Sequence, residues 1–258
     1  MPSNNSNQGH RRRLRERFLK SGLSGFQDYE IIELLLTMGT PRRDCKQPAK
    51  EALKRFKTVR GVLEASPEEL QQIEGIGSQN TICFSLLREV AERLLKEKII
   101  DKPIFSSAQQ IFDYLYLSMR GLKKEVFRVL FLNNQLQIIE IEDLFKGTVS
   151  SSQAPLRTVF ENALKHSAAS LVFVHNHPSG NPIPSLQDKE QTRELVFGGA
   201  VMCIRVLDHI IIGGDKYFSF AAEGLIGQYE TDFLNLKVKG ASEARRQLYR
   251  AKLFSEPD

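Results

Sequence analysis

The sequence predicts a mixed α/β protein of the α+β kind, in which a small all-α region precedes a β-sheet flanked by helices. In residues 11–102 apolar residues recur at helical spacing. From residue 125 to residue 213, short apolar runs rich in Val, Phe and Ile alternate with helical patterns in the order β-β-α-β-α-β-β. A chain of 258 residues can bury a core in one large domain or in two small ones.

Bulk composition bounds the class of protein. No apolar run approaches the ~18 residues that a membrane span requires, and no signal peptide opens the chain. The three cysteines, Cys45, Cys83 and Cys203, are scattered and odd in number, so they indicate no disulfide framework. We therefore expect a cytoplasmic protein with no membrane partner.

The excess positive charge belongs to the N-terminal part. Residues 1–102 hold 19 Lys and Arg against 14 Asp and Glu, a net charge of +5 that equals that of the whole chain. One interpretation is an anionic partner such as DNA, and the other is a solvated basic face.

The N-terminal part reads as a polar segment followed by helices. Residues 1–10 are low in apolar content, and we expect them to be disordered. The domain predicted at residues 11–102 begins with an arginine-rich helix. Further helices follow at 28–38, at 47–56, and on both sides of a turn at 75–77. The sequence Ser66-Pro67-Glu68-Glu69 predicts a capping box with proline at the first helical position.

The turn Gly75-Ile76-Gly77 between two helices is similar to the helix–hairpin–helix element. In that element the glycines let backbone N–H groups approach a DNA phosphate, so Gly75 and Gly77 are candidate phosphate-binding residues. No Lys or Arg follows the turn, and such turns also join helices that contact no DNA. Phosphate binding and a purely structural turn therefore both stay open.

A charged stretch ending at Pro103 predicts a domain boundary, followed by a domain at 103–226. Its expected helices span residues 108–119, 156–163 and 186–198. Its expected strands span residues 125–132, 136–141, 171–174, 201–207, 210–213 and 218–221. Residues 227–258 form a basic, amphipathic helical extension that docks on the domain or on a second subunit.

The chemistry is concentrated in residues 171–188. An apolar strand delivers His175 and His177 to its end, where their i, i+2 spacing points both imidazoles to the same side. A loop rich in Pro and Gly follows, and Asp188 lies in the first turn of the next helix. Two imidazole nitrogens and one carboxylate, with a fourth position open, are typical of a catalytic zinc site.

A helix cap is the alternative interpretation for part of this pattern. Ser185-x-x-Asp188 also fits an N-cap with an acidic residue where the helix dipole favours it. A cap does not explain two of the chain's five histidines at the end of an apolar strand. Ser185 can cap the helix and still face the metal.

The spacing His175-x-His177-x7-Ser185-x2-Asp188 resembles the JAMM (MPN-plus) motif of zinc-dependent isopeptidases. The segments HNHPSGNPIPS at 175–185 and LDHIIIG at 207–213 are similar to those of the RadC family of bacterial proteins. The resemblance covers residues 14–226. The resemblance implies a JAMM-type, cytidine-deaminase-like sheet that holds one Zn²⁺ through His175, His177 and Asp188. It also implies that Glu125, at the head of an apolar strand, is the general base, and that Ser185 stabilises an oxyanion.

Several acidic and histidine residues compete for these roles. Glu140, Glu142 and Asp143 are the other upstream acids, and we expect them in an exposed turn. His209 falls between two expected strands, where we expect it to make structural hydrogen bonds.

Two functions follow as hypotheses. The first is a zinc metallohydrolase, a peptidase or isopeptidase, in which water at the zinc, activated by Glu125, attacks an amide carbonyl of a protein or peptide. The second is a DNA-binding or DNA-repair-associated protein, whose zinc domain is a nuclease or a structural platform. The oligomeric state stays undetermined.

Overall fold

The computed structural model describes residues 4–40, 43–104, 108–147 and 153–253, and it has the mixed α/β fold that the sequence predicts. The chain divides into two compact units, Met1–Leu94 and Leu95–Asp258. This division precedes the predicted boundary and falls inside helix α6 (Ser78–Ile99). The reason is that Ile99, with Leu95 against it, packs into the core of the second unit.

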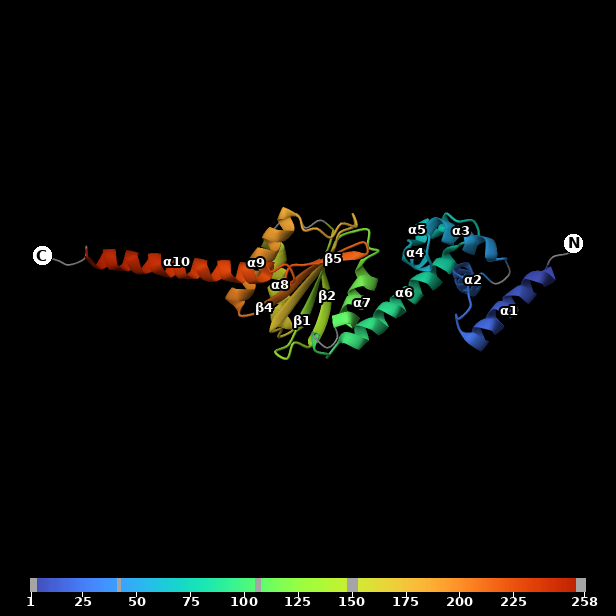
Figure 1. Ribbon diagram of the computed structural model, residues 1–258, viewed down its shortest axis with the longest axis horizontal. Helices are drawn as coiled ribbons and strands as arrows, with labels where there is room; N and C mark the ends of the chain where they lie inside the picture. The colour runs from blue at the N-terminus through green and yellow to red at the C-terminus, as the bar shows by residue number, and fades with distance from the viewer. Residues whose placement is uncertain (1–3, 41–42, 105–107, 148–152, 254–258) are drawn as a thin grey trace. The chain divides into compact units, whose positions relative to one another are not determined.

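The first unit consists of helices (Figure 1). They are α1 (Asn4–Ser21), α2 (Asp28–Gly39), α3 (Lys46–Phe56), α4 (Val59–Glu64), α5 (Pro67–Gln71) and most of α6. Their buried side chains form one cluster, whose largest fully buried members are Phe84, Ile32, Leu36 and Leu70. The predicted capping box is confirmed, because Ser66 accepts the amide of Glu69 and Glu69 accepts that of Ser66.

The start of α1 differs from the sequence prediction. We expected residues 1–10 to be disordered, but the helix begins at Asn4, and residues 1–3 lie outside the described part of the chain. Pro2 precedes the helix, and no proline occurs from Asn4 to Ser21, so the helix has no proline in its interior to break it. Pairs with α2 also hold α1, since His10 lies 2.9 Å from Glu33 and Arg17 lies 2.6 Å from Glu30.

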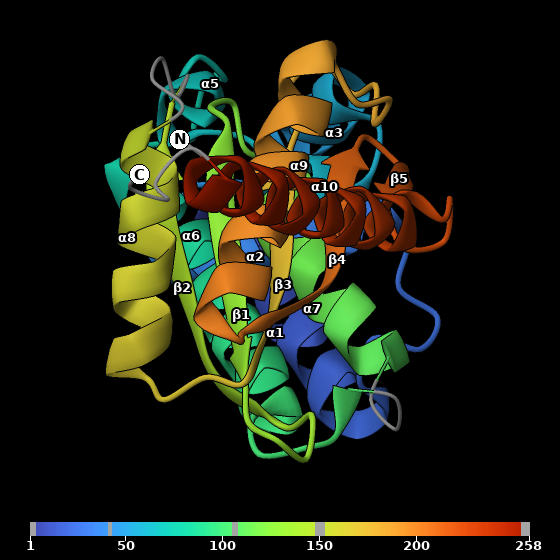
Figure 2. The same cartoon turned by 90° about the vertical axis from the view of Figure 1, so that its left-hand side faces the viewer.

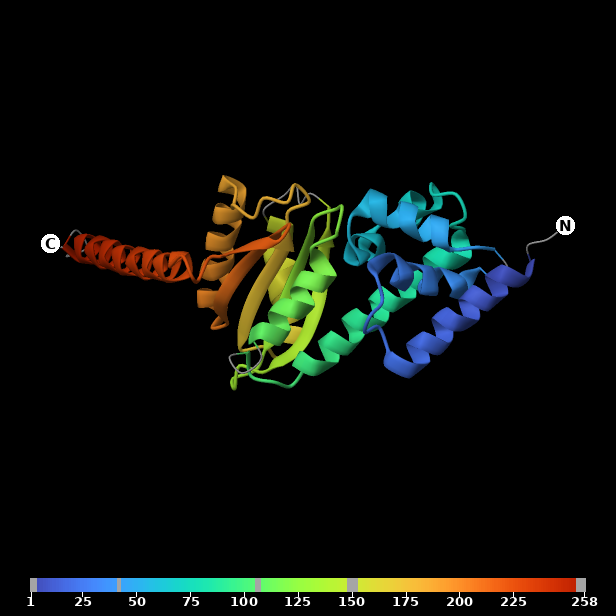
Figure 3. The ribbon, with the colours of Figure 1, turned by 45° about the vertical axis from the view of Figure 1, so that its right-hand side comes forward.

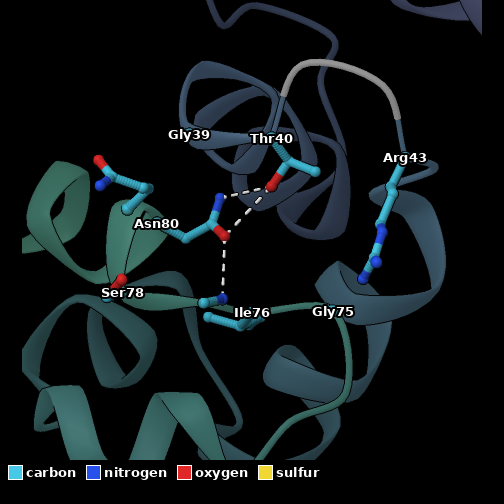
Figure 4. A pocket seen from close by; sticks show the side chains of 9 residues that line it. Gly39, Thr40, Arg43, Gly75, Ile76, Ser78 and Asn80 are labelled. Atoms are coloured by element: carbon cyan, nitrogen blue, oxygen red, sulfur yellow. Dashed lines mark hydrogen bonds between the residues drawn. The ribbon is translucent and has the colours of Figure 1, made fainter.

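A pocket lies at the turn before α6, and Figure 4 shows how Asn80 closes one side of it. The Asn80 side chain accepts the backbone amide of Gly77 at 3.1 Å and contacts the Thr40 hydroxyl. Gly75 has a φ of +89°, and an added Cβ there would lie 2.7 Å from a Pro48 ring carbon. The turn geometry therefore accounts for Gly75, whereas a Cβ on Gly77 would meet nothing within 4 Å.

The second unit is a five-stranded mixed sheet between two layers of helices (Figures 1 and 2). The strands are β1 (Val126–Leu132), β2 (Ile138–Lys146), β3 (Ser170–Asn176), β4 (Arg205–Gly213) and β5 (Lys216–Ser219). They lie in the order β2-β1-β3-β4-β5, and every neighbouring pair is antiparallel except β3 and β4. The helices of this unit are α7 (Ala108–Met119), α8 (Gln153–Lys165), α9 (Leu186–Met202) and α10 (Leu225–Leu253).

The alternation of side chains along β3 creates two separate cores. Leu171 and Phe173 pack with α8, α9 and the start of α10 on one face of the sheet. Val172 and Val174 pack on the other face with α7, which runs along the sheet in Figure 3. His175 continues the first series and Asn176 the second, so these two neighbours point to opposite faces of the sheet.

The acidic residues Glu140, Glu142 and Asp143 lie on strand β2, not in the exposed turn that we expected. β2 is an edge strand, and each acid on it has a basic partner. Glu140 binds Lys96 at 2.8 Å, Glu142 lies 3.0 Å from His166, and Asp143 binds Arg128 at 2.6 Å. These pairs make the charges compatible with a strand.

Residues 201–213 also differ from the prediction, which gave two strands with His209 between them. α9 continues to Met202, and a single strand, β4, runs from Arg205 to Gly213. His209 lies inside that strand, fully buried and hydrogen-bonded on both ring nitrogens. Its neighbour Asp208 accepts the Ser219 hydroxyl at 2.7 Å. The strand therefore tolerates both polar residues because each has partners.

The C-terminal extension begins as part of the second unit. α10 starts at Leu225, and Ile226 and Tyr229 are buried in the core beside α9. Residues 254–258 of the predicted extension lie outside the described residues. Within the described residues, no helix combines the length and apolar character that a bilayer-spanning segment requires.

Candidate metal centre

The end of strand β3 positions the two histidines of the motif. His175 is the penultimate residue of the strand and is 2% exposed, with its ring on the face covered by α9. His177 follows the strand, and its amide donates to the Ile212 carbonyl of β4 at 2.8 Å. The His177 ring is held from behind, since its Nδ1 lies 2.7 Å from the Asn181 carbonyl oxygen. The Nε2 atoms of the two rings face each other at 3.0 Å.

The start of helix α9 supplies the carboxylate. Ser185 is the N-cap of α9 and accepts the amide of Asp188, while the Asp188 carboxylate accepts both the amide and the hydroxyl of Ser185. The capping interpretation of Ser185 is therefore confirmed. The same bonds aim Asp188 at the histidines, with carboxylate oxygens 3.4 Å from His175 Nε2 and 3.5 Å from His177 Nε2.

Glu125 reaches the cluster from the residue before strand β1. β1 pairs with β3 so that Phe127 lies opposite His175, which brings Glu125 to the level of His177. A Glu125 carboxylate oxygen lies 3.9 Å from His175 Nε2. Glu125, His175, His177 and Asp188 each offer a ligand atom within 4.8 Å of the others, the one such group of His, Cys, Asp or Glu found among the described residues.

Asn176 anchors the segment that carries Glu125. Its side-chain oxygen accepts the amide of Val126 at 2.8 Å. Its side-chain nitrogen donates to the carbonyls of Leu122 and Lys124. Asn176 is 1% exposed, so these bonds are buried and hold the segment firmly to β3. Two consecutive residues on opposite faces of the sheet thus contribute to the site. His175 belongs to the cluster, and Asn176 holds the backbone on either side of Glu125.

The spacing of these atoms fits a divalent metal ion. A tetrahedral zinc ion with bonds of about 2.0–2.1 Å keeps its ligand atoms about 3.3 Å apart. The three separations among His175, His177 and Asp188 are 3.0, 3.4 and 3.5 Å. The larger distance to Glu125 leaves that carboxylate beside the predicted ligand set.

The pKa values agree with a ligand set. Burial lowers the pKa of His175 to about 4, so this imidazole is neutral at physiological pH. A hydrogen bond to Asp188 raises the pKa of His177. Burial alone would raise the pKa of Asp188, but hydrogen bonds from His177 and Ser185 hold it well below its usual range. Burial and the charge of Asp188 raise the pKa of Glu125, which makes its carboxylate a stronger proton acceptor.

Two residues lie directly behind the cluster, and only one of them was predicted from the sequence. His209 makes the structural hydrogen bonds that we expected, one with His175 and one with Thr192, a residue that the sequence prediction missed. Thr192 is one helical turn after Asp188 and carries the only hydroxyl on that turn of α9. This i, i+4 relation to a ligand is the signal that could have found it. Gly75 and Gly77 belong to the first unit and are not part of this cluster.

Two family models match the chain. One, described as the RadC-like JAB domain, matches residues 105–225, and the other, described as UPF0758 N-terminal, matches residues 7–82. The first match contains all four residues of the cluster, and the second contains the turn at 75–77.

Similar proteins come from several bacteria, and each is called a UPF0758 protein. That of Pseudoalteromonas translucida is 38% identical over 214 residues, which cover 83% of this chain and 96% of the relative. That of Fusobacterium nucleatum is 38% identical over 231 residues, which cover 87% of this chain and 100% of the relative. That of Rhodobacter capsulatus is 36% identical over 213 residues, which cover 83% of this chain and 100% of the relative.

The loop between His177 and Ser185 packs directly against the backbone of Gly213, which generates a testable prediction. A Cβ at this position would lie 2.5 Å from the Pro182 nitrogen and 2.7 Å from the Asn181 carbonyl carbon. Gly213→Ala therefore displaces the carbonyl that orients His177, and we expect Zn²⁺ affinity to fall about 10–100-fold, as when other groups that orient a ligand are lost. Competition with a chromogenic chelator measures this.

Gly227→Ala is the matched control, because a Cβ on that helical glycine would meet nothing within 4 Å. Equal Zn²⁺ affinity in the Gly213→Ala variant and in the control would contradict the role given to the loop.

Proposed function

The chain belongs to the UPF0758 family of RadC-like proteins, and from this we propose that it is a zinc-dependent hydrolase that cleaves an amide, as a peptidase or isopeptidase. The observation that carries the proposal is the convergence of His175, His177 and Asp188 at tetrahedral spacing, with Glu125 beside them. A structural zinc site would be expected to have a fourth protein ligand in the coordination shell and no need of a flanking base.

Each protein group has a distinct task in this proposal. A bound zinc ion would lower the pKa of water to about 7 and would polarise a carbonyl oxygen. Glu125, with its raised pKa, accepts the proton of the attacking water and returns it to the leaving nitrogen. Its side chain is 35% exposed, so water and substrate can reach it.

In the structure, the Ser185 side chain is hydrogen-bonded to Asp188. Its hydroxyl donates to Asp188 at 2.6 Å and its oxygen accepts the Asp188 amide. In this arrangement Ser185 orients the ligand. Stabilisation of an oxyanion by Ser185 remains part of the proposal, and it requires the hydroxyl to turn from Asp188 toward the substrate during the reaction.

Substitution of the proposed base tests this function. Glu125→Gln keeps the size of the side chain and removes its proton-accepting carboxylate. We expect hydrolysis of fluorogenic peptides or of an isopeptide-linked conjugate by the zinc-loaded protein to fall about 10²–10⁴-fold. We expect zinc content to be unchanged, because Glu125 lies outside the predicted ligand set.

Glu190→Gln, an exposed change on α9, is the matched control and keeps wild-type activity. Wild-type rates in the Glu125→Gln variant would contradict the assignment of the base. Cleavage by the zinc-loaded protein of another bond type, and not of amides, would contradict the substrate class.

The first unit supports a second proposal, binding of DNA. Residues 1–102, which include this unit, carry the net charge of +5, whereas residues 103–258 have a net charge of zero. In Figure 4 the Arg43 side chain extends beside Gly75 at the pocket that precedes α6. A helix start with a neighbouring arginine suits a phosphate. Against this, the Gly77 amide already donates to Asn80, so a phosphate would have to bind other groups.

Arg43→Ala tests this second proposal. We expect weaker binding of a fluorescent branched or single-stranded oligonucleotide and a salt dependence shallower by about 0.7–0.9 in log–log slope, the effect of one lost phosphate contact. Lys216→Ala, an exposed change in the second unit, removes the same charge and serves as control. No binding by the full chain at low salt, or equal loss in both variants, would contradict a DNA site at this pocket.

A further inference from the structure

A buried chain of hydrogen bonds runs behind the candidate metal centre. The Thr192 hydroxyl lies 2.6 Å from the backbone carbonyl oxygen of Asp188 and 2.7 Å from His209 Nδ1. His209 Nε2 lies 2.8 Å from His175 Nδ1. Thr192 and His209 are fully buried and His175 is 2% exposed, so no solvent competes for these bonds. The chain links two predicted ligands, Asp188 on α9 and His175 on β3, through strand β4.

The donor and the acceptor of each hydrogen bond can be assigned in turn, starting from the Asp188 carbonyl. A carbonyl oxygen can only accept, so the single Thr192 hydroxyl proton points to the Asp188 carbonyl. The Thr192 oxygen must then accept from His209, which places the proton of His209 on Nδ1. His209 Nε2 is left with a lone pair and must accept from His175. The proton of the neutral His175 ring is therefore on Nδ1, and its Nε2 lone pair faces the cluster.

The packing around His209 holds its imidazole ring in this orientation. Its ring stacks on Phe220, with centroids 5.2 Å apart and planes at 15°, and it makes T-shaped contacts with Phe127 and Phe173. Turning the ring over would exchange both nitrogens for carbons and lose both hydrogen bonds. The ring is fully buried against these aromatic side chains, where a charged imidazolium would be costly, so we treat it as neutral.

We propose that Thr192 and His209 are positioning residues that fix His175 in the Nδ1–H tautomer, the form whose Nε2 can bind a metal. This inference rests on the proposed function in taking the cluster as a metal site. It adds two residues to which that proposal gives no role. His177 reaches the same tautomer independently, through the Asn181 carbonyl. The Nδ1 atoms of the two predicted ligand histidines thus have different hydrogen-bond partners. That of His175 is the His209 side chain, and that of His177 is a backbone carbonyl.

Nitrogen NMR of the imidazoles tests the inference without any metal. Long-range ¹H–¹⁵N correlation spectra of the metal-free full chain distinguish the two tautomers of each of its five histidines, assigned through single substitutions. We expect His175 and His209 to be Nδ1–H tautomers in the wild type. Thr192→Val keeps the shape of the side chain but removes the hydroxyl, and it should yield a mixture of tautomers at both rings. Thr192→Ser restores the hydroxyl and should restore the spectrum.

Zinc affinity supplies the second readout. Loss of a group that orients a ligand typically weakens metal binding about 10–100-fold, and we expect this for Thr192→Val and for His209→Phe. Thr192→Ser should stay close to the wild type. In His209→Gln, the amide oxygen can still accept from His175 and the nitrogen can donate to Thr192, so affinity should be partly rescued. Circular dichroism on each variant distinguishes loss of positioning from unfolding.

The possible results separate this inference from the proposed function. An Nε2–H tautomer of His175 in the wild type, or wild-type zinc affinity in Thr192→Val, would overturn the positioning role. Failure of the wild type to take up zinc, with His175 in the Nδ1–H form, would remove the proposed function and leave the role of Thr192 and His209 in fixing the tautomer supported.

Discussion

Two imidazole nitrogens and a carboxylate are held about 3–3.5 Å apart, and the second unit is organised around that arrangement. Two lone pairs facing each other repel unless a proton or a cation lies between them. The hydrogen bond to Asp188 raises the pKa of His177, which favours a proton between the two nitrogens. A metal ion would take the place of that proton, so the site is already arranged for a positive charge.

The topology brings these groups together at one edge of the sheet. β3 and β4 are the parallel pair, and the chain leaves both strands at this edge, where ligand sites of α/β sheets commonly lie. β1 runs in the opposite direction, so its start lies at the same edge and brings Glu125 there. α9 begins there with Asp188 in its first turn. The buried hydrogen bonds of Asn176, Thr192 and His209 then fix the side chains on that frame.

The sequence predicted the parts of this site that local spacing determines. The i, i+2 histidines and the Ser185-x-x-Asp188 cap could be placed because each depends on one strand end or one helix start. Glu125 came from a family resemblance. Hydrogen bonding by His209 was predicted correctly, but its partner His175 was not, because that contact depends on the long-range pairing of β3 with β4. The acids of β2 were misplaced for a similar reason, since their partners Lys96, Arg128 and His166 lie elsewhere in the chain.

The most direct test of the zinc site is the metal content of the purified protein, measured by elemental analysis beside an Asp188→Asn variant. The asparagine oxygen can still accept the Ser185 amide, so the helix cap persists while the ligand charge is lost. We expect about one zinc ion per chain in the wild type and little in the variant. Absence of metal from the wild type, with no uptake when Zn²⁺ is added, would contradict a zinc site and leave Ser185 and Asp188 as a helix cap alone.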